Sequence, residues 1–65
     1  MNNHSPFLKL AKPAQRALQN AGIDDLEQLS KYTETEIAKL HGIGKNAILL
    51  LRQELNKKGL SFQQE

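Results

Sequence analysis

A glycine-isoleucine-glycine tripeptide at residues 42–44 places the strongest constraint on how this chain can fold. Glycine has no Cβ and reaches positive φ without a steric clash, so two glycines this close together predict a tight reversal of the chain. Apolar residues recur at helical spacing on both sides of it, at Ile37 and Leu40 before the turn and at Ile48, Leu51 and Leu55 after it. The sequence therefore predicts two helices joined by a glycine turn.

The helix expected after this turn has features of a phosphate site at its start. Its first N–H groups have no partner within the helix and lie at the positive end of the helix dipole. Lys45 stands at this point, and no carboxylate occurs between Ile37 and Gln53. Exposed amides beside a glycine turn and a lysine favour phosphate binding. A glycine turn that serves helix geometry alone is the competing interpretation.

Start and stop signals define the other helices. Pro13 is placed as in the first turn of a helix, which Gly22 then ends. Asp24 with Glu27, three residues on, predicts a capping box for a short second helix. A second capping box, Thr33 with Glu36, predicts a third helix that runs to Gly42, and the last helix is expected over residues 45–58, ended by Gly59.

The predicted fold class is all-α, a compact bundle of four to five short helices. We expect one domain over residues 7–62, with a flexible N-terminal tail at 1–6 and a C-terminal tail at 63–65. Phe7, Leu8 and Leu10 are expected to lay an arm of apolar side chains on the core. Leu60 and Phe62 are expected to fold back over it.

Composition excludes several classes of function. The 65 residues include no cysteine, so disulfides and thiol chemistry are absent, and two distant histidines do not predict a zinc site. No cofactor is expected. No apolar run approaches membrane-spanning length and no signal peptide is visible, which favours a cytoplasmic protein. The serines lack a recognisable base partner and the acidic pair at 24–25 fits helix capping, so we do not expect an enzyme.

The turn resembles the helix-hairpin-helix motif, h-x-x-L-h-G-h-G-x-x-x-A, which binds the DNA backbone without reading sequence. The matching positions are Ile37, Leu40, Gly42, Ile43, Gly44, Ala47 and Ile48. The resemblance implies a helix-hairpin-helix (SAM-like) arrangement of the bundle.

From about Phe7 the chain is also similar to the C-terminal domain of the bacterial RNA polymerase alpha subunit. The resemblance is carried by Leu10-x-x-Pro13-Ala14-x-Arg16-Ala17-Leu18, Ala21-Gly22-Ile23, Thr33-Glu34-x-Glu36-Ile37, Gly44-Lys45-Asn46-Ala47-Ile48 and Gly59-Leu60-Ser61-Phe62. It implies that the start of the first helix and the hairpin face the minor groove of A·T-rich promoter DNA, and that the same surface meets transcription activators. We expect a free-standing relative, not the subunit itself.

The resemblance implies a set of DNA-contacting residues. The family's minor-groove arginine position is Pro13 here, and its asparagine one turn later is Arg16. The hairpin glycine and lysine are retained as Gly44 and Lys45. The expected DNA-contacting residues are Lys12, Arg16, His41, Gly42, Gly44, Lys45 and Asn46.

Leu49 and Leu50 form a second candidate site. At about 100° per residue both lie off the stripe made by Ile48, Leu51 and Leu55. The family carries an acidic residue at the position of Leu50. The pair is therefore a candidate partner-binding or self-association surface, unless Phe7 and Leu8 cover it within the monomer.

Two hypotheses of function follow. The first is a small, monomeric, non-enzymatic domain of the transcription apparatus that binds duplex DNA weakly, with little dependence on sequence or a preference for A·T. The second is a protein-interaction module of the transcription or DNA-repair machinery that has lost most of its DNA affinity. The choice depends on whether Arg16 replaces the arginine contact that Pro13 cannot make.

Overall fold

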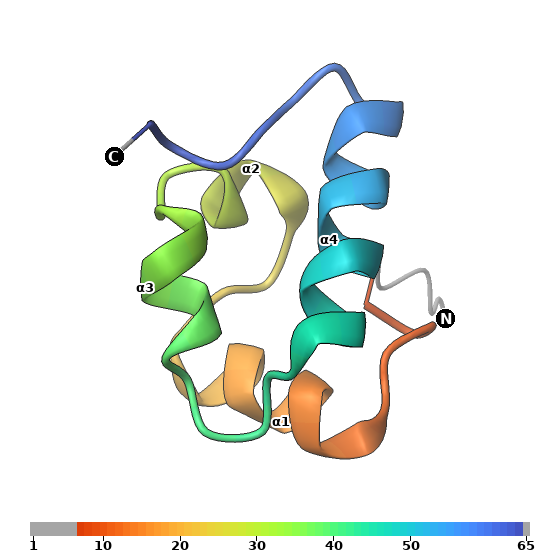
Figure 1. Ribbon diagram of the computed structural model, residues 1–65, viewed down its shortest axis with the longest axis vertical. Helices are drawn as coiled ribbons and strands as arrows, with labels where there is room; N and C mark the ends of the chain where they lie inside the picture. Colours follow the sequence, from red (N-terminus) through yellow and green to blue (C-terminus); the bar gives the residue numbers. More distant parts are fainter. Residues whose placement is uncertain (1–6, 65) are drawn as a thin grey trace.

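The computed structural model describes residues 7–64, which contain four helices and confirm the all-α fold (Figure 1). The helices are α1 (Lys12–Asn20), α2 (Leu26–Leu29), α3 (Glu34–Ala38) and α4 (Lys45–Lys57). Within this range the only β contact is an isolated bridge between Thr33 and Gln63. The tail expected at residues 1–6 and the last residue of the tail expected at 63–65 lie outside the described residues.

Helix α1 begins and ends as its sequence signals predict. A proline occupies its first turn, and Ala21 caps its C-terminus. Gly22 follows with φ +79°, and the N–H of Ile23 donates to the carbonyl of Leu18 at 2.9 Å. This bond satisfies one of the carbonyls left free at a helix end and directs Ile23 into the core.

The cap of α2 lies one residue later than the sequence pattern predicts. Asp25, not Asp24, is the N-cap, and its carboxylate accepts from the N–H of Gln28 at 2.8 Å. The side chain of Gln28 in turn accepts from the N–H of Asp24 at 2.6 Å. The predicted box of Asp24 with Glu27 is therefore wrong. A helix that starts at Leu26 buries both of its leucines, and this burial selects between two adjacent aspartates that can both cap.

The capping box of α3 is confirmed. The N–H of Glu36 donates to Thr33 Oγ1 at 3.0 Å, and the N–H of Thr33 donates to the Glu36 carboxylate at 2.9 Å. The regular helix ends at Ala38, short of the predicted end at Gly42. Beyond it the chain continues in single turns, in which the N–H of Leu40 donates to the carbonyl of Ile37 at 3.1 Å.

The core is built from side chains of every helix and of the segment before α1. Its largest fully buried members are Leu18, Ile23, Leu29, Ile37, Leu51 and Leu55. Phe7 and Leu10 are buried as expected, but Leu8 is 59% exposed, which corrects the expectation that it lies on the core. The N–H of Leu10 donates to the carbonyl of Phe7 at 3.0 Å, and this turn leaves Leu8 and Lys9 on its outer side.

Helix α4 is the longest helix among the described residues, with 13 residues, and falls short of the length and apolar character needed to cross a membrane. Gly59, with φ +72°, follows its end. The chain then crosses the far end of the bundle above α2 (Figure 1), where Leu60 and Phe62 pack against the core. The N–H of Gln63 donates to the carbonyl of Tyr32 at 2.8 Å and fastens this segment.

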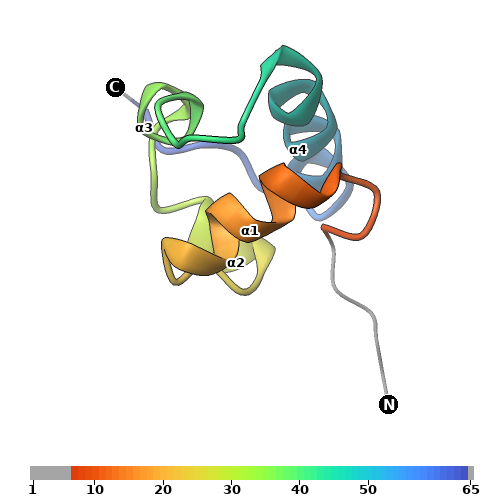
Figure 2. The same cartoon turned by 90° about the horizontal axis from the view of Figure 1, so that it is seen from below.

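The hairpin between α3 and α4 packs directly on the start of α1. Gly42 has φ +102°, and a Cβ added to it would lie 2.6 Å from the carbonyl oxygen of Pro13. Gly44 has φ −110° and nothing within 4 Å of such a Cβ. Of the two hairpin glycines, only Gly42 therefore requires the absence of a side chain, both for its backbone conformation and for its close approach to α1. Viewed from below, α1 lies across the end of the bundle at which the hairpin turns (Figure 2).

This difference between the glycines predicts unequal effects of substitution. Gly42→Ala should lower the free energy of unfolding by at least about 2 kcal/mol, because it adds left-handed strain and a clash with the backbone of Pro13. Gly44→Ala should change it by less than about 0.5 kcal/mol. Urea unfolding of both variants measures these values, and equal losses would contradict the assignment of the turn.

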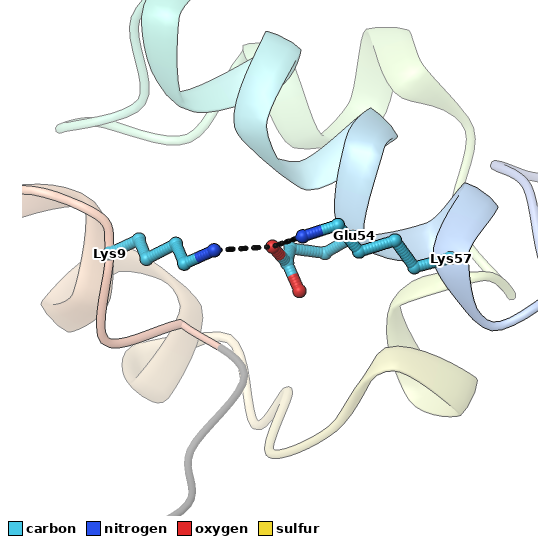
Figure 3. A network of polar contacts seen from close by, with 3 residues as sticks. All are labelled: Lys9, Glu54 and Lys57. Atoms are coloured by element: carbon cyan, nitrogen blue, oxygen red, sulfur yellow. Dashed lines mark hydrogen bonds and ion pairs between the residues drawn. The ribbon is translucent and has the colours of Figure 1, made fainter.

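An ion-pair cluster joins the segment before α1 to the second half of α4 (Figure 3). The carboxylate of Glu54 lies 3.5 Å from Lys9 Nζ and 3.4 Å from Lys57 Nζ, and only 19% of its side chain is exposed. Desolvation by burial acts to raise the pKa of Glu54. The hydrogen bonds and charges of Lys57 and Lys9 outweigh it and hold the pKa below its usual value of 4.5.

A lowered pKa in the folded state means that the unfolded chain binds the proton more tightly. The stability from Glu54 is therefore present above pH 4.5 and is lost as the pH falls through the lower, folded value. Glu54→Gln should unfold more readily than the parent at neutral pH and equally readily in acid. The control Glu27→Gln, at an exposed position in the first turn of α2, removes only a helix-dipole contribution and should keep most of the parent's loss of stability on acidification. Thermal melts at both pH values test this, and identical pH profiles for parent and Glu54→Gln would contradict it.

Candidate nucleic-acid interface

Residues from the starts of α1 and α4 line one groove. It lies at the end of the bundle where Gly42 approaches Pro13. Residues of the segment before α1, of α1, of the hairpin and of α4 line it: Leu10, Ala11, Ala14, Gly42, Gly44, Lys45, Asn46, Ala47 and Leu50. Its floor is apolar and its rim on the α4 side carries Lys45 and Asn46. The groove therefore offers helix N-termini, a cation and an open backbone in one place.

The structure places all seven expected DNA-contacting residues on the surface. Four of them, Gly42, Gly44, Lys45 and Asn46, line the groove itself. Lys12 follows Ala11 of the groove lining, and Arg16 lies one turn further along the exposed side of α1. His41 directly precedes Gly42 in the turn.

The two helices that meet here begin differently from the other two. Neither α1 nor α4 has a side-chain cap or an acidic residue in its first turn. Both α2 and α3 have a side-chain cap and a glutamate in their first turns. At the start of α4 the first-turn N–H groups are thus left without a competing carboxylate. In α1 only the N–H of Lys12 is left, because Pro13 has no N–H and the N–H of Ala14 donates to the carbonyl of Ala11 at 3.0 Å.

A lysine is the first residue of each of these two helices, Lys12 of α1 and Lys45 of α4. The positive end of the helix dipole disfavours a cation at this position by about 0.3–1 kcal/mol at an exposed site. The sequence therefore departs twice from a local rule of helix stability, at Lys45, which lines the groove, and at Lys12, which follows groove-lining Ala11. Such conflicts between local preference and structure are expected at functional sites.

The charge of this end is not neutralised within the described chain. Residues 7–23 and 37–53 contain no Asp or Glu. Among residues 7–64, the ion pairs are those of Lys9 and Lys57 with Glu54 and of Arg52 with Glu34. Lys12, Arg16 and Lys45 take part in none of them. Their charge is therefore available to an anionic ligand.

Leu49 and Leu50 do not share one surface. Leu49 is 52% exposed, on the side of α4 that faces α3. Leu50 is half-buried, packs against the core and lines the groove beside α1. The expectation that Leu50 lies clear of the core is wrong: it packs against the core, and it lines the groove together with Leu10, Ala11 and Ala14.

Sequence reasoning missed the role of Pro13. The sequence pattern identifies Pro13 only as the start of a helix. In the structure its carbonyl lies so close to Gly42 of the hairpin that a side chain there would clash with it. No periodicity connects positions 13 and 42. The available signal was steric: a glycine in a turn marks a place where another backbone can approach closely.

A comparison with models of known protein families gave no match, and a search of curated proteins gave none either.

The geometry predicts that the cations of this groove do not hold the fold together. Lys45→Gln should leave the free energy of unfolding unchanged or raise it by up to about 0.5 kcal/mol, because it removes a cation from the positive end of α4. Arg16→Gln should change it by less than about 0.5 kcal/mol. Urea unfolding provides the measurement. A loss above about 1 kcal/mol in either variant would mean that the side chain has a structural partner.

Proposed function

We propose that this end of the bundle binds the backbone of duplex DNA at the minor groove and catalyses no reaction. The observation that carries the proposal is the uncapped, acid-free start of α4, whose Lys45 lines a groove that α1 also borders. Lys12, the first residue of the equally uncapped α1, follows groove-lining Ala11. Free N–H groups, a dipole end and an unpaired cation together favour a phosphate.

In this proposal the start of α4 binds one phosphate. Its first N–H groups donate to the phosphate oxygens, and Lys45 neutralises their charge. The open position at Gly44, where even a Cβ would meet nothing within 4 Å, lets the DNA backbone approach the amides. Asn46 and His41 can add side-chain hydrogen bonds to phosphate.

The start of α1 contributes a second contact, on the other side of the DNA minor groove. Lys12 reaches a phosphate on the neighbouring strand, and Arg16 enters the minor groove, whose potential is most negative where A·T tracts narrow it. Pro13 stands at the position of the family's arginine and has no cationic side chain, so in this proposal Arg16 takes the place of that arginine. With three cations, we expect affinity to be weak and to depend little on base sequence beyond a preference for A·T.

The resemblance to the C-terminal domain of the bacterial RNA polymerase alpha subunit supports DNA binding by this same end of the molecule. There the start of the first helix and the hairpin face DNA. We therefore propose a role connected with transcription in a bacterial cytoplasm, for a free-standing, monomeric relative of that domain. A transcription protein is a further candidate partner.

An NMR titration of the labelled protein with a short A·T-rich duplex at low salt tests the proposal. Shifts should cluster in residues 12–16 and 41–47. Lys45→Glu and Arg16→Glu should each abolish them without unfolding the domain. The control Lys58→Glu, at the opposite end of α4, should bind like the parent. The logarithm of the affinity should fall with the logarithm of salt concentration with a slope of about −3 or shallower.

Shifts confined to residues 57–64, or no shift at low salt, would contradict DNA binding by this surface. Either result would favour the second hypothesis, a module that retains the fold and binds protein only.

A further inference from the structure

A second groove lies on the other side of α4, between α4 and α3, which run antiparallel (Figure 1). It is lined by Glu34, Ala38, Ile43, Gly44, Lys45, Ile48, Leu49 and Arg52. It shares only Gly44 and Lys45 with the groove beside α1. The two grooves therefore differ in most of their lining residues, and this groove fits a ligand of different chemistry from the DNA backbone.

The floor of this groove is apolar and partly open to solvent. Leu49 is one of two large apolar side chains that are exposed among the described residues, the other being Leu8. Ile43 is half-buried, and Ile48 is 8% exposed and joins the floor to the core. Together they present an apolar surface inside a concave site, not a single leucine on a convex face.

Cations stand at both ends of this floor. Lys45 and Arg52 are seven residues apart on α4, so they lie on one face about 10.5 Å apart along the helix axis. Leu49 lies between them, four residues after Lys45 and three before Arg52. Glu34 is the one carboxylate in the lining, and it is already paired with Arg52. Lys45 has no ion-pair partner among residues 7–64.

We propose that this groove binds a segment of another protein in which one large apolar side chain is flanked by carboxylates. The apolar side chain would cover Leu49 and Ile43, and one carboxylate would pair with Lys45. The other carboxylate would accept from the guanidinium N–H groups of Arg52 that its pair with Glu34, made through Nη2, leaves free. Duplex DNA offers the charge, but its apolar groups, the thymine methyls and sugar carbons, do not project as a single side chain into a concave floor. A second copy of this chain does not fit either, since its other exposed leucine, Leu8, is followed by Lys9, a cation.

A selection from a phage library of random short peptides tests this inference, and it does not depend on DNA binding. Enriched peptides should carry a Leu, Ile, Met or Phe with Asp or Glu on both sides. Synthetic copies should shift the amide signals of residues 43–52 in the labelled protein. A duplex that fails to bind would not alter this result, so the two proposals fail separately.

Matched variants locate the binding site. Leu49→Asn should weaken the selected peptides by at least about tenfold, because it removes the apolar contact at the centre of the site. Leu8→Asn changes the same side chain at the other exposed position and should bind like the parent. Lys45→Gln and Arg52→Gln should each weaken binding, whereas Lys58→Gln should not. Thermal melts confirm that each variant is folded.

Three results would overturn the proposal. They are a selection that enriches no peptide, enriched peptides without flanking carboxylates, and enriched peptides whose affinity is the same for Leu49→Asn as for the parent.

Discussion

The contact between the backbone of Gly42 and the carbonyl of Pro13 determines how the rest of the molecule is arranged. It joins two parts of the chain that are far apart in sequence, the hairpin and the first turn of α1. A side chain at residue 42 would force them apart, because its Cβ would fall within 2.6 Å of the Pro13 oxygen. With glycine there, α1 lies across the end of the bundle and its N-terminus meets that of α4. Every feature of the candidate DNA surface follows from this convergence.

The starts of the four helices fall into two groups that differ in charge. The acidic residues of α2 and α3 stabilise helix starts away from the groove, where a side-chain cap contributes about 1 kcal/mol. The starts of α1 and α4 have no such cap and carry lysines instead, so they depend on tertiary packing for their stability. The buried face of α4 and the ion pairs of Glu54 supply part of that packing. The proposed function thus uses the two helix ends that local interactions stabilise least.

Local signals made most of the fold predictable. Gly22, Gly59 and the Thr33 capping box act through bonds between near neighbours, and the structure has each of them where the pattern places it. Where two local solutions compete, as between Asp24 and Asp25, burial of Leu26 and Leu29 in the core decides, and the pattern alone gave the wrong residue. Leu50 packs against the core and shares the groove lining with Leu10 and Ala11, and no helical periodicity links these two residues to α4. For the candidate site, the exposure of its residues was predictable, but the groove that unites them required the Gly42 contact.

The central claim is that the starts of α1 and α4 form a single DNA-binding surface. Cross-saturation NMR tests it most directly: the protons of an A·T-rich duplex are irradiated, and the signal loss is measured at the amides of the deuterated protein. The account predicts loss at residues 14–16 of α1 and at residues 44–46 of the hairpin and α4 in the same complex. Loss at only one of these two segments, or at residues 57–58 instead, would contradict it.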